Sequence, residues 1–326
     1  MSDTLQASKG RTKTALPLID VAPLRGSDRA ARQAVGDQLR IACEQRGFFY
    51  MAGHGIEPAL IDAVFAQAQR LFGLPDADKQ ALDKAHSRCN RGYEPLRNQT
   101  LQSGTQPDLK EGFYLGVDLP EHDPRVRAGR FNHGPNVWPE GLPGFRPTME
   151  RYFASMLELG TLLMRGLALS LRLPEEHFDP ILDGTMATLR LLHYPPQPPQ
   201  PLPGERGCGE HTDFGSLTLL LQDEVGGLQV LDAAGGWIDA PPLPGTYVVN
   251  IGDLIARWTN RRYHSTLHRV LNSSGRERYS VPFFLAGAPD YLIECLPGCL
   301  APGDTAAFAP VTVEQHITEC FRRTYG

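Results

Sequence analysis

The stretch from residue 186 to residue 296 constrains the fold most, because it consists of short β-rich runs separated by glycine and proline turns. Short strands at this spacing are typical of an antiparallel sandwich or barrel. The Pro-rich segment 195–204 is predicted to be a surface loop rather than a domain linker, because strands of one sheet system flank it. The predicted strands cover residues 187–194, 216–221, 228–231, 247–251, 268–271 and 279–285.

The part of the chain before this stretch shows helical spacing instead. Over residues 28–46 the apolar side chains recur at helical intervals, and Gly47 follows as the stop. A helix rich in Leu and Met is predicted over 147–171, and Thr312 is predicted to cap a final helix over 313–323. The other predictions are strands over 16–19 and 48–51, helices over 58–72 and 77–84, and loops with short strands over 86–136.

A single folded domain is expected. The chain has 326 residues, 41% of them hydrophobic, which is enough for a sizeable core, and no internal repeat divides it. Residues 1–15 are predicted to form a disordered tail, and residues 16–326 one domain that is mainly β with flanking helices. Within this domain, 16–140 form an N-terminal region of helices and strands, and 186–296 form the β core.

Composition argues against several classes of partner. The formal net charge is −5 and there is no basic block, so nucleic acid is not expected as a partner. The longest apolar runs, such as residues 217–221, are too short to cross a bilayer, and the N-terminus lacks the apolar segment of a secretory signal. Six cysteines without a C-x-x-C pair are expected to be free thiols. We therefore expect a cytoplasmic protein that does not act in a membrane.

His211 and Asp213 lie two residues apart in the β-rich stretch, and His268 follows later in the same stretch. Two imidazoles and one carboxylate are the ligand set of a non-haem Fe(II) oxygenase, which leaves three positions of the metal open. Because side chains alternate along a strand, His211 and Asp213 are predicted to point to the same face, with His268 on a neighbouring strand.

Spacing alone leaves other interpretations of these residues open. His264 lies four positions before His268, but Ser265 and Thr266 form helices poorly, and no acid follows His264 as in the zinc motif H-E-x-x-H. A zinc hydrolase would need a general base beside the metal. Glu210 is the nearest acid in sequence, yet adjacent residues of a strand face opposite ways. A binding protein without chemistry would be expected to have lost a ligand.

Arg278 and Ser280 form a second pair two residues apart on a predicted strand. A guanidinium grips a carboxylate through two hydrogen bonds, and a hydroxyl adds a third. An arginine that faces into a barrel is costly unless it is paired, and no acidic residue stands two positions away on either side. A bound dicarboxylate would supply the partner; a surface arginine is the alternative.

A series of motifs, taken in order, resembles the isopenicillin N synthase-like group of 2-oxoglutarate- and Fe(II)-dependent oxygenases. The resemblance covers about residues 16 to 320, and the order of the motifs makes it highly specific. The matching segments are PLID at 17–20, GFFY at 47–50, HGI at 54–56, HTDFGSLTLL at 211–220, GGLQV at 226–230, VNIGD at 249–253, WTN at 258–260, STLHRV at 265–270 and RYS at 278–280.

This resemblance implies a double-stranded β-helix, or jelly roll, as the core. It implies Fe(II) bound by His211, Asp213 and His268, with 2-oxoglutarate and O2 as cosubstrates. It further implies that Arg278, Ser280 and Tyr194 bind the distal carboxylate of 2-oxoglutarate. Some plant relatives carry an asparagine where this chain has Leu192, so that contact is not carried over. Asn250 and Asp253 are interpreted as structural.

The expected reaction is oxidation of a C–H bond of a small organic substrate, hydroxylation above all, coupled to conversion of 2-oxoglutarate to succinate. The alternative is an Fe(II) oxidase of the same fold that does not use 2-oxoglutarate, as in isopenicillin N synthase-like ring closure. Neither the substrate nor the oligomeric state can be read from the sequence. The candidates for contact with the substrate are Phe214, Phe283, Arg190 and Tyr93, with Arg97 as a further arginine of the same region.

Overall fold

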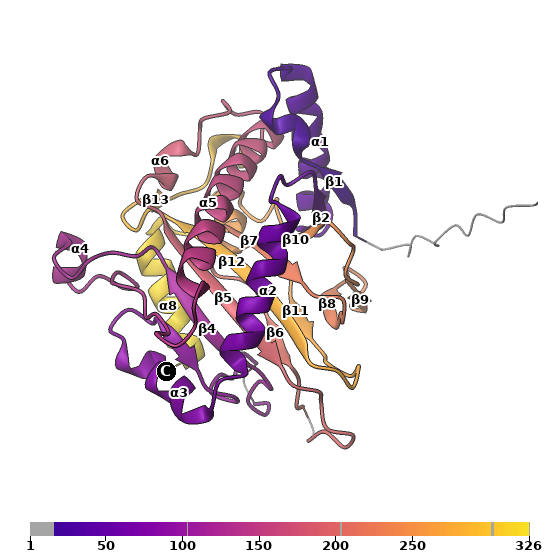
Figure 1. Cartoon of the computed structure of the whole chain (residues 1–326). Coiled ribbons are helices and arrows are strands. Elements are labelled where there is room, and N and C mark those ends of the chain that lie inside the picture. The colour runs from indigo at the N-terminus through magenta and orange to yellow at the C-terminus, as the bar shows by residue number, and fades with distance from the viewer. Residues whose placement is uncertain (1–15, 103, 203, 301–302, 326) are drawn as a thin grey trace, which may run out of the picture.

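The fold is a jelly roll with helices packed on one side, and the computed structural model describes residues 16–102, 104–202, 204–300 and 303–325 (Figure 1). The tail predicted over residues 1–15 lies outside this range. The larger sheet has eight strands in the order β1-β2-β10-β7-β12-β5-β4-β3. Its strands are β1 (Leu18–Asp20), β2 (Phe48–Ala52), β3 (Gly92–Glu94), β4 (Glu111–Gly116), β5 (Met186–Tyr194), β7 (Leu217–Gln222), β10 (Tyr247–Ile251) and β12 (Arg278–Gly287).

A smaller sheet faces the larger one and has the order β6-β11-β8-β9. The apolar layer between the two sheets includes Leu192 and Tyr194 from the larger sheet and Val230 and Val270 from the smaller one. This layer is the interior of the jelly roll. The smaller sheet consists of β6 (Cys208–His211), β8 (Leu228–Leu231), β9 (Trp237–Asp239) and β11 (His268–Val270), and a separate pair is formed by β13 (Leu292–Ile293) and β14 (Val311–Thr312).

The other face of the larger sheet packs against helices, and α5 (Phe145–Ser170) and α2 (Pro58–Phe72) run across it in Figure 1. Contacts here are close: a Cβ added at Gly36 would lie 2.9 Å from the Cβ of Leu169, where α1 meets α5. The helices are α1 (Arg29–Gln45), α2, α3 (Asp76–Ala81), α4 (Pro124–Arg127), α5, α6 (Asp179–Leu182), α7 (Asp253–Trp258) and α8 (Val313–Tyr325), with 3₁₀ turns at Ala22–Arg25, Lys84–His86 and Pro297–Cys299.

Helix α5 also has the length and composition of a membrane-spanning segment. Counting uninterrupted apolar runs missed this, because α5 contains scattered charged residues. More than half of the most apolar 18-residue stretch of α5 is buried inside the protein. A helix in the core of a folded domain can have the same length and composition. The burial of Met156, Leu163 and Leu167 identifies α5 as the helix that covers the larger sheet.

Several predicted boundaries are confirmed by their capping groups. The carboxylate of Asp28 accepts hydrogen bonds from the backbone N–H groups of Ala30 and Ala31 at the start of α1. Gly47 ends this helix with φ of +67°, where a Cβ would lie 1.8 Å from the carbonyl oxygen of His264. Thr312 caps α8 by accepting a hydrogen bond from the N–H of Gln315. The six cysteines are free thiols, as expected.

The sequence prediction missed the short elements. Strands β6 and β9 and helix α7 have no clear apolar periodicity of their own, and pairing with neighbouring segments holds them in place. Strand β4 lies within the segment predicted as loops and short strands, and all six of its residues are buried. These elements matter for function because β6 and the segment around β4 border the site described next.

Candidate metal and cosubstrate site

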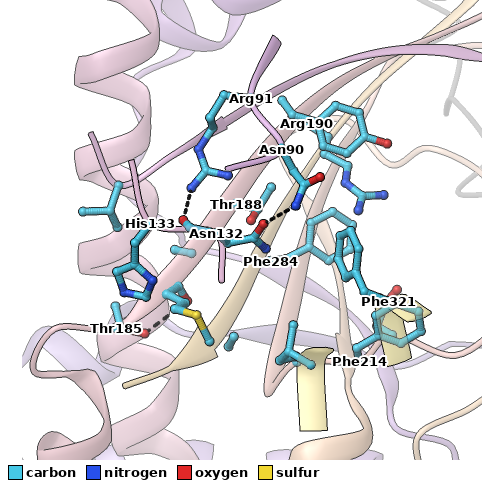
Figure 2. Close-up of a pocket in the computed structure, with 18 of the residues that line it drawn as sticks. Asn90, Arg91, Asn132, His133, Thr185, Thr188, Arg190, Phe214, Phe284 and Phe321 are labelled. Atoms are coloured by element: carbon cyan, nitrogen blue, oxygen red, sulfur yellow. Dashed lines mark hydrogen bonds between the residues drawn. The ribbon is translucent and has the colours of Figure 1, made fainter. Parts of the chain in front are cut away.

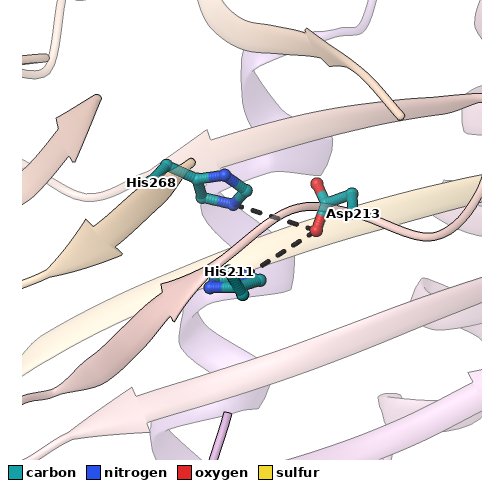
Figure 3. Close-up of side chains that lie close together, drawn as sticks. All are labelled: His211, Asp213 and His268. Atoms are coloured by element: carbon teal, nitrogen blue, oxygen red, sulfur yellow. Dashed lines mark ion pairs between the residues drawn. The ribbon is translucent and has the colours of Figure 1, made fainter. Parts of the chain in front are cut away.

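The three predicted metal ligands converge at one end of the smaller sheet (Figure 3). His211 is the last residue of β6, and His268, the first residue of β11, lies directly opposite it in the antiparallel register. The Oδ1 atom of Asp213 lies 3.7 Å from Nε2 of His211 and 3.8 Å from Nε2 of His268. One ligand atom from each residue lies within 4.8 Å of the other two, so a single ion could contact all three.

Asp213 reaches this position by a different route from the predicted one. The prediction placed His211 and Asp213 on the same strand face, but β6 ends at His211 and Asp213 lies in the loop that follows. The backbone carbonyl of Asp213 accepts a hydrogen bond of 2.8 Å from the N–H of Asp253, at the start of α7. The loop therefore carries the carboxylate to the histidines, and strand alternation does not.

Both histidines are oriented by backbone carbonyls. The Nδ1 atom of His211 lies 2.8 Å from the carbonyl oxygen of Gly209, and the Nδ1 atom of His268 lies 3.1 Å from that of Thr266. Because a carbonyl oxygen only accepts hydrogen bonds, each Nδ1 carries the proton and each Nε2 lone pair faces the centre of the group.

The second oxygen of Asp213 is held by two polar side chains. Its Oδ2 accepts hydrogen bonds from Thr218 at 2.5 Å and from Asn250 at 2.7 Å. Oδ1 is thereby left facing the two imidazoles. Asn250 was interpreted from sequence as structural, and Thr218 was not singled out. Their positions on strands that line the interior are the only local signal of this role.

Electrostatics favour the metal-binding protonation state of Asp213 and of His268. Burial alone would raise the pKa of the Asp213 carboxyl, but His268, His211 and its hydrogen bonds together lower it. Burial, with His211 as a second cause, lowers the pKa of His268 to about 4. The Asp213 carboxylate and a neutral His268 imidazole are therefore present at neutral pH, as an Fe(II) ligand set requires.

The rival interpretations of the sequence do not fit this geometry. The exposed His264 is not part of the cluster of three ligands. Glu210 accepts hydrogen bonds from Arg206 at 2.5 Å and from Arg269 at 3.1 Å, so it is engaged as an ion-pair partner. Another group of potential ligands, Asp253, His316 and Cys320, has a guanidinium already beside it: Arg323 lies 3.1 Å from the Cys320 sulfur.

A small cavity of about 60 Å³ lies between the two sheets and reaches from the ligand cluster to Arg278. Arg278 is fully buried, so the alternative of a surface arginine is wrong. The guanidinium donates to the carbonyl of Gly226, the hydroxyl of Ser280 and the side-chain carbonyl of Gln222, at 2.6, 3.1 and 3.1 Å. The ring of Tyr194 lies 4.7 Å from its central carbon.

Among the described residues, these hydrogen-bond partners of Arg278 include no carboxylate. A buried cation is costly without a counter-charge, and a carboxylate bound in the small cavity would provide one. Ser280 and Tyr194 also line this cavity, as do the three potential metal ligands. The residues present therefore fit a small dicarboxylate placed between a metal ion and Arg278.

A larger cavity of about 320 Å³ lies on the other side of the ligand cluster (Figure 2). His211 and Asp213 line both cavities, so a metal ion held there would face both. Of the candidate substrate residues, Phe214 and Arg190 line the larger cavity. Arg190 also lines the smaller one and therefore lies where the two meet.

Two other candidates require correction. Phe283 lies on β12 at the alternate position to Arg278 and Ser280, so its side chain points to the opposite face and packs against Phe153 of α5, with ring centroids 5.3 Å apart. Its neighbour Phe284 lines both cavities instead. Phe283 was predicted to contact the substrate because it is close in sequence to Arg278 and Ser280. This criterion was wrong, because odd and even positions along a strand point to opposite faces.

Tyr93 is also a core residue, not a cavity residue. It is 5% exposed, and its hydroxyl donates to a carboxylate oxygen of Glu111 at 2.5 Å. Arg97 likewise lies outside the lining and pairs with Glu205 at 2.6 Å. Residues of the same region that do line the larger cavity are Asn90, Arg91, Gln99 and Leu101.

Comparison with known proteins gives a consistent family. Residues 16–141 match the family described as non-haem dioxygenase in morphine synthesis N-terminal, and residues 186–287 match the 2OG-Fe(II) oxygenase superfamily. The chain is 47% identical to the 2-oxoglutarate-Fe(II) type oxidoreductase hxnY of Emericella nidulans, over 96% of this chain and 91% of that protein. It is 37% identical to the clavatol oxidase claD of Penicillium crustosum, over 95% and 97% of the two chains.

A solved structure of a full-length protein of Neurospora crassa, in complex with alpha-KG (2-oxoglutarate) and thymine, superimposes with a TM-score of 0.81. Sequence identity is 30%, and the match covers 94% of this chain and 97% of that one. Fold, ligand cluster and relatives agree on Fe(II), 2-oxoglutarate and O2 as the reactive components. The chain therefore belongs to the 2-oxoglutarate- and Fe(II)-dependent oxygenases and is an Fe(II)/2-oxoglutarate-dependent dioxygenase.

Proposed function

We propose that His211, Asp213 and His268 hold the Fe(II) ion, and that Arg278, Ser280 and Tyr194 bind the distal carboxylate of 2-oxoglutarate in the small cavity. The substrate lies in the larger cavity, where a C–H bond is hydroxylated while 2-oxoglutarate is converted to succinate and carbon dioxide. The observation that supports this assignment is that His211 and Asp213 line both cavities, as expected if one metal ion lies between cosubstrate and substrate.

The bound iron supplies oxygen activation and couples decarboxylation of 2-oxoglutarate to substrate oxidation. The protein contributes position and protection. Thr218 and Asn250 fix the Asp213 carboxylate, while Arg278 anchors the far end of the cosubstrate. Apolar side chains of the small cavity exclude water from this end of the site, which strengthens the charged hydrogen bonds formed there. These apolar residues are Phe48, Leu192, Leu220, Leu228 and Val270.

The names of the relatives support a small-molecule substrate. One relative is a clavatol oxidase, and a solved neighbour holds thymine; both named compounds are small molecules. The larger cavity supports the same proposal, because its volume of about 320 Å³ lies in the range of pockets that bind small molecules. A cytoplasmic location and the absence of nucleic acid and membrane partners stay predictions of the sequence.

The proposal is tested by release of labelled carbon dioxide from 2-oxoglutarate labelled at C1. We expect release that depends on added Fe(II) and O2 and that disappears in the variant Asp213→Ala. The matched control is Glu210→Gln, which changes the adjacent acid that faces away from the cluster. An oxidase of the same fold would release none, and full release by Asp213→Ala with added iron would refute the ligand assignment.

A further inference from the structure

Strand β6, which carries His211, lies at the edge of the smaller sheet. Among the residues that the structure describes, β11 is its one strand partner, and the register between the two strands shifts between His268 and Val270. A short, irregular ladder on one side gives an edge strand little support, and proteins often cover the other side with a loop. The position of His211 therefore depends on what lies along the outer edge of β6.

The segment that leads into β4 covers this outer edge. The backbone N–H of Leu109 donates to the carbonyl oxygen of Arg206, shortly before β6, at 2.8 Å. Within β6, the N–H of Gly209 donates to the Oδ1 atom of Asp108, also at 2.8 Å. A side-chain carboxylate therefore accepts the hydrogen bond that a neighbouring strand would otherwise accept.

Gly209 connects this contact to the proposed iron site. Its carbonyl oxygen lies 2.8 Å from Nδ1 of His211 and accepts the hydrogen bond that orients the imidazole. Its N–H is the group that Asp108 holds. Asp108 thus fixes the residue whose carbonyl sets the direction of the ligand, although Asp108 is not itself in the ligand cluster.

The two segments approach each other as closely as a glycine allows. A Cβ added at Gly209 would lie 3.0 Å from both Cβ and the backbone nitrogen of Gln102, and 3.2 Å from Oδ1 of Asp108. The side chain of Gln102 also accepts a hydrogen bond from the N–H of Glu210 at 3.4 Å. A side chain at position 209 would therefore push β6 away from Asp108.

A buried ion pair holds the carboxylate of Asp108. Asp108 is 2% exposed and Lys110 is 3% exposed, and the ammonium group of Lys110 donates to the Oδ2 atom of Asp108. Each charge would be costly to bury alone, and each offsets the other. Because Lys110 occupies Oδ2, the Oδ1 atom faces Gly209. Lys110 also lines the small cavity, so the pair lies beside the proposed position of 2-oxoglutarate.

We propose that Asp108 is a positioning residue of the iron site. It fixes the outer edge of β6 through the N–H of Gly209, and this holds the imidazole of His211 in the direction that binds Fe(II). Lys110 balances the charge of Asp108. The inference rests on the proposed function, because it requires His211 to be an iron ligand. It makes the affinity for Fe(II) depend on a segment outside the three ligands.

Two double variants isolate the hydrogen bond to Gly209. Asp108→Asn with Lys110→Met removes both buried charges and keeps an oxygen that can accept from the Gly209 N–H. Asp108→Leu with Lys110→Met removes the charges and this acceptor as well. Fe(II) affinity is measured by titration of the metal-free protein without oxygen. We expect the Leu variant to bind Fe(II) about tenfold more weakly than the Asn variant, as removal of groups that orient metal ligands does elsewhere.

Gly209→Ala tests the same contact without a change of charge, and it decides the question if the Leu variant does not fold. Its Cβ should displace β6 from Asp108 and weaken Fe(II) binding in the same way. The control Asp28→Ala removes a carboxylate that accepts hydrogen bonds from backbone N–H groups at the start of α1. It should lower the midpoint of thermal unfolding and leave the Fe(II) affinity unchanged.

Two results would overturn the inference. One is equal Fe(II) affinity in the Asn and Leu variants, and the other is wild-type affinity in Gly209→Ala. The visible charge-transfer absorption of Fe(II) chelated by 2-oxoglutarate distinguishes these results from failure of the proposed function. If the wild type shows the absorption and the variants bind Fe(II) equally well, only the role of Asp108 fails. If the wild type does not show it, the proposed iron site fails and the inference fails with it.

Discussion

The two cavities that meet at His211 and Asp213 are built from different kinds of sequence. Nearly all lining residues of the small cavity lie on strands of the jelly roll, and Leu101, Lys110 and Asp213 are the exceptions. The larger cavity instead draws much of its lining from loops between residues 90 and 133 and from α5, α6 and α8. The proposed iron and cosubstrate site is thus built mainly on regular strands, whereas the proposed substrate cavity depends largely on irregular segments.

Strand β12 contributes to both cavities and shows why the difference matters. Arg278 and Ser280 face inward with Phe284, while Phe283 faces the helices. On a strand the inward set follows from one known member. No such rule exists for the loops, so Arg91 could not be placed on the cavity from its neighbours in sequence. The predictions below test whether the two cavities are separable in function.

The largest effect on activity is expected from a change at Asp213, which lines both cavities. Asp213→Ala should abolish Fe(II)-dependent succinate formation, since it removes the only carboxylate ligand of the proposed set. Both cavities should lose function together: iron binding, measured by titration with Fe(II), and turnover should fall in parallel. Succinate formation at the wild-type rate in this variant would separate the carboxylate from the metal.

A change at the far end of the small cavity should affect one cosubstrate. Arg278→Ala should raise the KM for 2-oxoglutarate about 10- to 100-fold, because a charged hydrogen-bond partner is lost. Arg278→Lys, which keeps the charge but not the bidentate geometry, should raise it less. Steady-state kinetics with varied 2-oxoglutarate measure both variants, and circular dichroism checks their fold. An unchanged KM in both would show that this arginine does not bind the cosubstrate.

The two hydrogen bonds that hold Asp213 should affect the affinity for Fe(II) and not the binding of 2-oxoglutarate by Arg278. Asn250→Ala should weaken Fe(II) binding about 10- to 100-fold, as removal of a partner that orients a ligand does in other metal sites. Thr218→Val, which keeps the shape but removes the other donor to Oδ2, should act in the same direction. Fe(II) titration is the measurement. Equal affinity in wild type and both variants would mean that the two hydrogen bonds serve only the fold.

Acid should destabilise the helix that covers the larger cavity. His316 of α8 is buried, and burial, with Arg257 as a second cause, lowers its pKa to about 4. In the unfolded chain His316 takes up a proton near pH 6.5, whereas in the folded chain it does so only near pH 4. The free energy of unfolding therefore falls as the pH drops from about 6.5 to about 4, and the contribution of His316 is constant below pH 4. At pH 5 the loss is roughly 2 kcal/mol. Denaturant unfolding of His316→Gln should show a flatter pH profile than wild type; identical profiles would contradict the assignment.

The smallest effects are expected at Phe283 and Phe284, where one substitution should affect stability and the other activity. Phe283→Leu should lower the free energy of unfolding by about 1 kcal/mol through lost packing, while KM values stay unchanged. Phe284→Leu should leave stability nearly unchanged and alter substrate-stimulated succinate release, because its ring lines both cavities. Unfolding and kinetics are measured for both variants. The reverse pattern would show that the assignment of strand faces is wrong.

Local sequence signals were strong for the regular part of the molecule. The bounds predicted for α2, β8 and β10 coincide with those of the structure, because apolar patterns and the residues at their ends define them. The candidate metal ligands and the pair Arg278 and Ser280 were also proposed from residue types two positions apart together with the resemblance to the family, and the structure brings them to the two ends of one small cavity. By contrast, Asn250 and Thr218 act through a hydrogen bond to a residue on another segment of the chain, and no local pattern reveals such a partner.

The sequence by itself therefore determined the family, the jelly roll and the chemical types of the reactive residues, because these depend on short-range order along the chain. The tertiary structure decided which oxygen of Asp213 faces the histidines, which phenylalanine faces the cavities and which arginines line the larger cavity. The physical reason is that loops have no fixed periodicity, so the positions of their side chains are set only when distant segments pack together.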